Sequence, residues 1–237
     1  MLPLNEIHCK DNLDYLRELP DACVDLVVTD PPYNVSVQGD FKFNGKEIKK
    51  DFGQWDYNFD PEPVLRELKR VLKPNGQIYI FCATKQISEY MTILFRDWYF
   101  RQILVWYRRN PCPRLSKTNF LFAADYIMYG INEKLSLSKV TFNFTTQTDM
   151  HNVIITNALQ GKERLRNPDN KSLHPTQKPL EVLRKLIAVS SNPGDIVLDP
   201  FMGVGSTAVA AKQLGRNFLG CEINQLYVDA ANLRLSR

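Results

Sequence analysis

Hydrophobic residues recur along this chain in two patterns, short unbroken runs and runs with helical spacing. The unbroken runs predict buried strands at 24–28, 77–82, 103–107, 124–131, 195–199 and 217–221. The helical spacing predicts helices at about 11–19, 60–72, 86–95, 179–187, 205–214 and from 224 onwards, the last with Leu226, Tyr227, Ala230 and Leu233 on one side. Strands that alternate with helices imply an α/β fold with a mostly parallel sheet and helices on both faces.

Two segments follow neither pattern. Residues 35–58 mix glycines with lysines, and residues 134–170 are polar, with weak strand signals at 140–144 and 153–156. Long irregular segments in a compact domain are usually functional or disordered. Both segments are therefore candidates for contact with a substrate.

Length and composition fit one domain over residues 1–237, with 44% hydrophobic residues and a formal net charge of +4. This charge excludes a strongly cationic nucleic-acid coat but allows a local basic face. The five cysteines are scattered and the three histidines do not cluster, so we expect neither a disulfide framework nor a metal site. No stretch is long enough to span a membrane and no signal peptide is visible, so we expect a cytoplasmic protein without a membrane partner.

The first chemical signature follows the apolar run 24–28 and reads Asp30-Pro31-Pro32-Tyr33. The Asp30 carboxylate and the Pro31 carbonyl are two acceptors, and Pro32 keeps the residue before it extended. Acceptors fixed in this way can hold both N–H groups of an aromatic amine, while Tyr33 offers a flat face to a base. The plainer alternative is a proline-rich turn with Tyr33 in the core. The position directly after a buried strand favours a site.

The second signature runs from Asp199 to Thr207 and also follows an apolar run. Gly203 and Gly205 allow the backbone to turn sharply and to approach a ligand closely. Ser206 and Thr207 then begin a helix whose exposed N–H groups face that ligand. The pattern indicates a loop that binds a cofactor.

The residues around this loop narrow the kind of cofactor. Ala208 stands where dinucleotide-binding loops carry their third glycine, which disfavours a pyrophosphate. Glu222, at the end of the following strand, is placed to bind ribose hydroxyls. Alternatively, Glu222 only caps the helix that begins at Asn224. We favour a nucleoside-bearing cofactor because Asp199 ends the neighbouring strand.

Together these segments look like the DNA amino-methyltransferases that modify adenine N6 or cytosine N4, specifically their circularly permuted β group. In that group the catalytic tetrapeptide precedes the cofactor glycines, as it does here. Five segments match in the order of the family: Lys10 to Asn12, Asp30 to Tyr33, His174 to Pro179, Asp199 to Thr207, and Glu222 to Tyr227. The resemblance implies a Rossmann-like fold with a mostly parallel seven-stranded sheet, S-adenosylmethionine as methyl donor and DNA as substrate.

The resemblance also implies the residues of the site. Four would handle the target base: Asp30, Pro31, Pro32 and Tyr33. Those around the cofactor would be Asp11, Asp30, His174, Pro175, Thr176, Lys178, Asp199, Pro200, Phe201, Gly203, Gly205, Ser206, Thr207, Glu222, Asn224 and Tyr227. Glu222 would hold the ribose, Asp11 would face the adenine, and residues 174–179 would wall the methionine end. His174 could also serve as a general base, but the two prolines that bracket it favour a packing role.

The family contains several substrates, and this chain departs from its pattern at Lys10, where many relatives carry glycine. An Asp rather than a Ser at position 30 resembles the adenine-N6 members, so we expect methylation of adenine N6 in a specific duplex sequence by base flipping. The alternatives are cytosine-N4 methylation, methylation of RNA or protein, and a non-catalytic DNA-binding subunit. The resemblance allows a homodimer and a cognate restriction endonuclease as partners. We expect a prokaryotic or phage-encoded protein that works at the nucleoid.

Basic residues gather in the irregular segments and are candidates for phosphate contact. We expect a small target-recognition insertion at about 108–172 and a loop at about 34–58. The DNA-binding candidates are Lys42, Lys46, Arg108, Arg109, Arg114, Lys117, Arg164 and Arg166. The alternative for each cluster is an ordinary solvated surface. Residues that read bases are not assigned, because geometry decides among the many Asn, Gln and Arg side chains.

Overall fold

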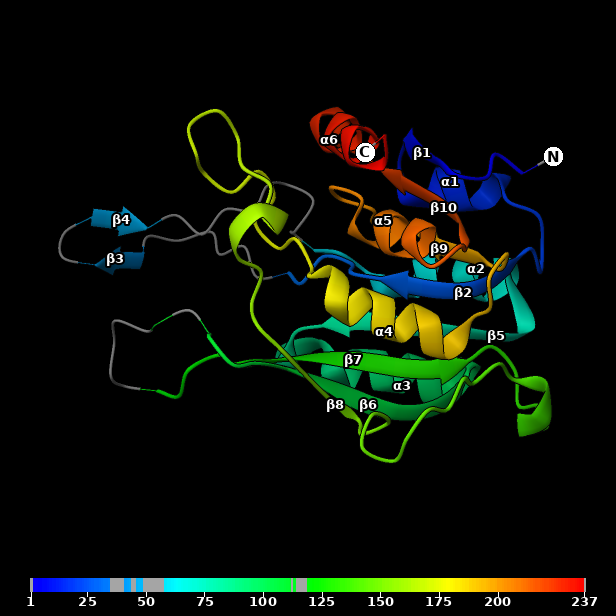
Figure 1. Ribbon diagram of the computed structural model, residues 1–237. Coiled ribbons are helices and arrows are strands. Elements are labelled where there is room, and N and C mark those ends of the chain that lie inside the picture. Colours follow the sequence, from blue (N-terminus) through cyan, green and yellow to red (C-terminus); the bar gives the residue numbers. More distant parts are fainter. Residues whose placement is uncertain are drawn as a thin grey trace.

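A computed structural model of the protein describes residues 2–34, 41–43, 46–48, 58–111, 113 and 119–236. Its centre is an eight-stranded sheet with the order β1-β10-β9-β2-β5-β7-β6-β8 (Figure 1). The strands are β1 (Glu6–Cys9), β2 (Val24–Thr29), β5 (Leu72–Cys82), β6 (Tyr99–Arg108), β7 (Ala124–Ile131), β8 (Val153–Thr156), β9 (Ile196–Asp199) and β10 (Asn217–Glu222). A separate antiparallel pair, β3 (Phe41–Phe43) and β4 (Lys46–Ile48), projects from one side of the molecule.

The sheet is mostly parallel, because β7 alone among the eight strands runs antiparallel to its neighbours β5 and β6. The pairs β1–β10, β10–β9, β9–β2, β2–β5 and β6–β8 are all parallel. Parallel neighbours place their carboxyl ends at the same edge of a sheet. The ends of β2, β9 and β10, where the sequence carries its acidic residues, therefore lie at one edge.

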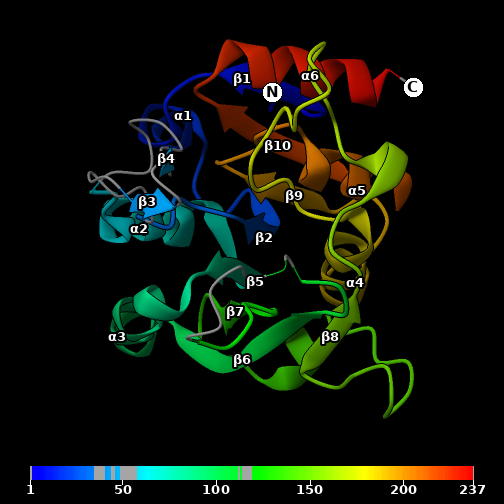
Figure 2. The ribbon, with the colours of Figure 1, turned by 90° about the vertical axis from the view of Figure 1, so that its left-hand side faces the viewer.

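Helices cover both faces of the sheet (Figure 2). On one face lie α1 (Asn12–Glu18), α2 (Pro61–Val71) and α3 (Ile87–Asp97), and on the other α4 (Leu180–Ser190), α5 (Ser206–Gln213) and α6 (Gln225–Leu235). Short 3₁₀ turns occur at Thr84–Gln86, Leu137–Lys139 and Gly161–Glu163.

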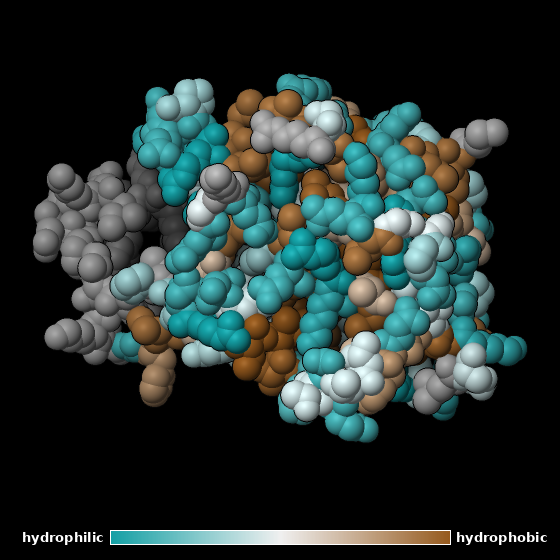
Figure 3. Space-filling model, in the orientation of Figure 1, coloured by the Kyte–Doolittle hydropathy of each residue, from teal (hydrophilic) through white to brown (hydrophobic). Residues whose placement is uncertain are grey.

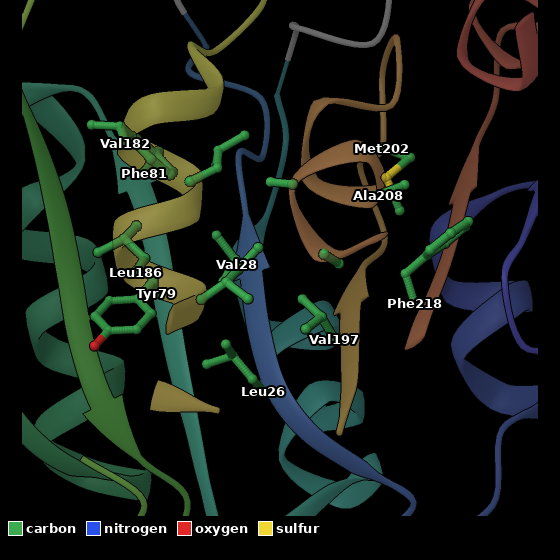
Figure 4. Close-up of a cluster of buried hydrophobic side chains, with 14 of the residues drawn as sticks. Leu26, Val28, Tyr79, Phe81, Val182, Leu186, Val197, Met202, Ala208 and Phe218 are labelled. Carbon is green, nitrogen blue, oxygen red and sulfur yellow. The ribbon is translucent and has the colours of Figure 1, made fainter. Parts of the chain in front are cut away.

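Each face has its own hydrophobic cluster. The one in Figure 4 joins β2 and β5 to α4 through Leu26, Val28, Tyr79, Phe81, Val182 and Leu186. Val27 points to the opposite cluster, beneath α1 and α2. Because both faces are covered, every residue from Leu26 to Val28 is buried, which explains the unbroken apolar run. Over the outer side of α4 the surface is mainly hydrophilic (Figure 3).

The predicted helix starts are correct where the sequence supplies a capping side chain. The side chains of Asp11, Asp60 and Asn224 each accept a hydrogen bond from a backbone N–H in the first turn of α1, α2 and α6. Pro179, predicted as the first helical residue, is instead the cap residue of α4 and has no side-chain acceptor.

The observed sheet differs from the predicted one in its strands and in the extent of the inserted segment. It has eight strands rather than seven. The sequence pattern missed β1, because this edge strand has only Ile7 buried, and the weak signal at 153–156 is the edge strand β8. No strand forms at 140–144. The range 108–172 also contains β7, which lies inside the sheet, so the described residues outside the sheet are 109–111, 113, 119–123, 132–152 and 157–172.

The predicted apolar side of the last helix is wrong. Leu226 and Leu233 are each 58% exposed, while Val228 and Ala231 face the core. The reason is that α6 lies close to the start of α5, so the contact is made by the small side chain of Ala231. In the described part of the chain no helix is long and apolar enough to cross a membrane.

Candidate active site

The two acidic strand ends meet at one cavity. Strands β2 and β9 are direct parallel neighbours, with Leu26 opposite Val197 and Val27 opposite Leu198. Asp30 and Asp199 therefore reach the same edge, and both line a cavity of about 320 Å³. This volume is in the range of small-molecule sites. The base signature and the cofactor loop thus share one site.

Asp30 is largely buried, with its side chain 18% exposed, and has partners on both carboxylate oxygens. The Tyr33 hydroxyl donates to Oδ1 at 2.6 Å, and the Lys178 ammonium donates to Oδ2. Burial raises the pKa of the Asp30 carboxyl, and the Lys178 charge and both hydrogen bonds oppose this rise. The ionised form of Asp30 therefore depends on Lys178, a residue that we expected to contact the cofactor.

The backbone around the tetrapeptide is fixed by two amide side chains. The Gln86 amide donates to the Pro32 carbonyl at 2.9 Å. Asn34, with φ of 52°, donates to the Phe59 carbonyl at 2.9 Å and accepts from the Phe59 N–H at 2.8 Å. These contacts hold residues 30–34 against the starts of α2 and α3, so the acceptors of the site are preorganised.

The Asp199 carboxylate is occupied inside the protein. Oδ1 accepts from the Thr29 hydroxyl at 2.9 Å and from the Phe201 N–H at 3.0 Å, and Oδ2 accepts from the Thr207 hydroxyl at 2.7 Å. Burial raises the pKa of Asp199 to about 6. Although Asp199 lines the cavity, its hydrogen bonds shape the loop and tie β2 to β9.

The loop after β9 is joined to the end of β10 through Glu222. Glu222 Oε2 accepts from the Gly203 N–H at 2.9 Å, and Oε1 accepts from the Asn224 N–H at 2.9 Å. The α6 cap itself comes from Asn224, whose side chain accepts from the Leu226 N–H at 3.0 Å. Glu222 thus lines the cavity and also supports the loop, and burial raises its pKa.

Three residues predicted around the cofactor, Pro175, Gly205 and Asn224, do not line the cavity. Gly205 has a φ of 77°, and a Cβ there would lie 2.7 Å from the Ala231 Cβ. Its glycine is therefore required for the approach of α5 to α6. The other predicted cofactor residues and all four tetrapeptide residues line the cavity.

His174 is packed into one wall of the cavity. Its ring lies 4.7 Å from the Tyr227 ring, and its Nδ1 accepts from the Thr176 N–H at 3.3 Å. Burial, assisted by the Lys178 charge, lowers the pKa of His174 to about 4. An imidazole with so low a pKa is a weak base, which supports the packing role over that of a general base.

Several lining residues were not among the predicted site residues. Lys10, Asn12, Gln177, Met202, Val204 and Ile223 lie inside the matching segments, whereas Val28, Thr29, Phe59, Phe81 and Leu183 lie outside them. Asn12 Oδ1 is buried and has no hydrogen-bond partner among the described residues. Asp11 lies beside it and caps α1 by accepting from the Leu13 N–H at 2.9 Å. An unpartnered amide oxygen in the wall fits a ligand that carries N–H donors, such as an adenine ring.

The basic candidates for DNA contact are divided between paired and exposed side chains. Arg108 forms an ion pair with Asp125, and the two side chains are only 14% and 13% exposed. Arg109 is exposed, and Arg166, also exposed, donates to the Asn170 carbonyl at 2.7 Å. Arg164 is partly buried and donates to the Leu159 carbonyl at 3.3 Å. Lys42 and Lys46 lie on β3 and β4.

Arg114 and Lys117 lie outside the described residues, as does most of the loop at 34–58. The β3–β4 pair, the chain after β6 and the segment before α4 leave the molecule on the same side (Figures 1 and 2). This is the side to which β2 and β9 point. Among the described residues no group of His, Cys, Asp and Glu is arranged to hold a metal ion.

A family model for DNA methylases of the N6/N4 amino-methyltransferase type matches residues 24–233. The chain belongs to this family. The Type II methyltransferase M.HinfI of Haemophilus influenzae is 34% identical over 247 residues, which cover 98% of this chain and 68% of that protein. M.HpaI of Haemophilus parainfluenzae is 32% identical over 253 residues, which cover 96% of this chain and 73% of that protein.

Solved structures agree with this DNA methylase assignment. M1.HpyAVI in complex with S-adenosylmethionine (SAM) has a TM-score of 0.74 at 28% identity, over 98% of this chain and 99% of that one. The cytosine-N4-specific PvuII DNA methyltransferase has a TM-score of 0.69 at 16% identity, over 98% of this chain and 88% of that one. At this identity the likeness supports the fold alone. The predicted Rossmann-like methyltransferase fold and the predicted cofactor are confirmed.

Proposed function

We propose that this DNA methylase transfers the methyl group of SAM to the exocyclic N6 of adenine in a specific duplex sequence. The observation that carries the proposal is the single cavity shared by Asp30 and the loop after β9. A carboxylate at position 30, where other members of the family carry serine, supports adenine over cytosine. The chain's membership of the DNA methylase family supports DNA over RNA or protein.

The target nitrogen is a poor nucleophile because its lone pair is delocalised into the base. The Asp30 carboxylate and the Pro31 carbonyl accept the two N–H groups, so that the nitrogen becomes pyramidal and its lone pair is freed. When bound, SAM supplies a methyl group on a positively charged sulfur, which leaves as a neutral thioether. The proton that the nitrogen loses passes to water or to Asp30. Neutral His174 has no part in it.

The cofactor would occupy the part of the cavity between the loop after β9 and the end of β10. Glu222 would accept hydrogen bonds from ribose hydroxyls, and Asp11 and Asn12 would face the adenine ring. Gly203 would permit close approach of the backbone. His174 and Thr176 would close the methionine end of the site.

The base must leave the duplex to reach this buried site, so we propose base flipping with Tyr33 as one stacking surface. Target recognition would use the segments outside the sheet within 108–172 and the loop at 34–58. A homodimer and a cognate restriction endonuclease remain predictions. A DNA substrate supports a cytoplasmic protein, prokaryotic or phage-encoded, that works at the nucleoid.

The test is to incubate the protein with duplex DNA and methyl-labelled SAM and to identify the modified nucleosides by mass spectrometry. We expect N6-methyladenine, and at least about a 100-fold lower rate for Asp30→Ala. Asp229→Ala, an exposed change on α6, is the control and should keep the wild-type rate. N4-methylcytosine as the product would overturn the base assignment, and an active Asp30→Ala would overturn the role of Asp30.

A further inference from the structure

Lys178 lies in the wall of the cavity, and its ammonium is aimed at Asp30. The residue is only 7% exposed, and its Nζ donates to Asp30 Oδ2. The same Nζ lies 5.1 Å from the centre of the Tyr33 ring and 5.2 Å from that of Phe81. A buried ammonium between two rings and one carboxylate has little freedom to reach elsewhere.

The backbone on both sides of Lys178 is held in place. The preceding residue, Gln177, accepts from the Leu165 N–H at 3.0 Å and donates to the Glu163 carbonyl at 2.8 Å. On the other side, the Glu163 carboxylate accepts from the Leu180 N–H at 2.6 Å and so provides the cap that Pro179 lacks. Residues 177–180 are therefore held in a position that places the Lys178 side chain in the site.

The other charged groups near Asp30 are acidic or neutralised. Asp125 raises the pKa of Asp30, and Asp30 in turn raises that of Asp199. Arg108 is paired with Asp125. Without Lys178, the Asp30 carboxyl would be buried beside two other carboxylates, with Tyr33 as its hydrogen-bond donor.

We propose that Lys178 is a positioning residue for methyl transfer, which keeps the Asp30 carboxylate ionised and correctly oriented for the target amine. This inference rests on the proposed function. A protonated Asp30 would present an O–H donor and lose part of its capacity to accept from the amine. Lys178 and Tyr33 each use one acceptor position on different oxygens. A further lone pair on each oxygen stays available to an N–H group of the base.

This role differs from the contact with the methionine end of the cofactor that the sequence implies for the same residue. If Lys178 acts on Asp30, its loss changes how the reaction depends on pH. If it acts on the cofactor, its loss weakens cofactor binding at every pH. The two effects are measured separately.

The experiment compares single-turnover methylation rates of the wild type, Lys178→Met and Lys178→Arg between pH 5.5 and 9.5, with SAM affinity measured by calorimetry. An opposite charge in contact lowers a carboxyl pKa by about 1–3 units. For Lys178→Met we therefore expect the acidic limb of the pH–rate profile, where the rate rises with pH, to move to higher pH by about one unit or more. On the acidic side of this limb its rate should fall by about tenfold for each unit of the shift, and it should recover at higher pH, where Asp30 is ionised again. Lys178→Arg, which keeps the charge, should keep the wild-type limb.

SAM affinity should stay within about threefold in both variants, and Lys212→Met, at the end of α5, should match the wild type throughout. Loss of the Lys178 charge also removes one of the two effects that lower the pKa of His174, and Lys178→Arg, which keeps a charge at position 178, controls for this. A Lys178→Met enzyme with an unchanged limb, or with a uniform loss of rate at all pH values, would overturn the proposal. If Lys178→Met does not fold, Lys178→Gln takes its place. An active Asp30→Ala would instead show that the proposed function is at fault.

Discussion

At the scale of single residues, the two buried aspartates have different tasks. Asp199 accepts three hydrogen bonds, from Thr29, Phe201 and Thr207, and so joins the ends of two strands. Asp30 keeps free lone pairs that can accept hydrogen bonds from the cavity, and the positive charge of Lys178 balances its negative charge. Sequence alone gives both residues as acidic strand ends, because the partners that distinguish them come from distant segments.

The raised pKa of Asp199 predicts a pH dependence of stability. Its pKa is about 6 in the folded protein and near 3.8 when unfolded, so the folded state binds the proton more tightly between these values. The stabilisation is fully present below about pH 4 and is lost as the pH rises through 6. Compared with Asp199→Asn, the wild type should lose on the order of 3 kcal/mol of unfolding free energy across this range.

Urea unfolding of both proteins from pH 4 to 7.5 measures this difference. Asp229→Asn, on an exposed site, is the control and should show a constant difference from the wild type. A wild type whose unfolding free energy stayed constant or rose with pH, relative to that of Asp199→Asn, would contradict this prediction.

At the scale of elements, the strands and helices follow from the pattern of apolar residues, and the capped helices begin where the sequence predicts. The edge strands β1 and β8 were harder to predict, because they bury few residues and so show only a weak pattern of apolar positions. The segment before α4 shows a different limit. Its position over the cavity depends on Glu163 and Gln177, whose contacts with Leu180 and Leu165 have no signature in the sequence.

A substitution at Gly203 tests the contact between the segment before α4, which carries His174, and the loop after β9. Its φ is 51°, and a Cβ would lie 3.2 Å from His174 Nε2. Gly203→Val should therefore displace His174 and weaken SAM binding by at least about tenfold, as strain of 1–3 kcal/mol implies. Gly194 is a matched control, because its φ is 91° and nothing lies within 4 Å of the added Cβ.

Gly194→Val should lose stability through backbone strain but keep its affinity for SAM in calorimetry. Equal affinities for the two variants would show that the contact with His174 does not shape the cofactor site.

At the scale of the whole molecule, the cavity lies at the carboxyl edge of the sheet. The β3–β4 pair and the segments that follow β6 and precede α4, which carry basic clusters, lie on that side (Figures 1 and 2). The sequence predicted these basic clusters, but it did not distinguish exposed arginines from paired ones. Arg108 and Arg109 are adjacent in sequence, yet only the Arg108 side chain is paired with a carboxylate, that of Asp125. That difference depends on β7, which brings Asp125 opposite Trp106.

Arg109 and Arg108 should therefore respond differently to substitution. Arg109→Ala should weaken DNA binding about equally for all sequences and reduce the salt slope of log affinity by about 1, as expected for one lost phosphate contact. Arg108→Ala should mainly lower the melting temperature, because it leaves Asp125 as a buried unpaired charge. Binding titrations at several salt concentrations, together with thermal unfolding, separate the two. An unchanged slope for Arg109→Ala would remove it from the DNA interface.

The Thr29–Asp199 hydrogen bond joins residues that are 170 positions apart, and β1 meets the rest of the sheet only through β10. A nascent chain on the ribosome therefore cannot assemble this cleft until translation has passed residue 222. Products of premature termination would lack β9 or β10 from the interior of the sheet and would have no methyl-transfer activity, rather than a weakened one.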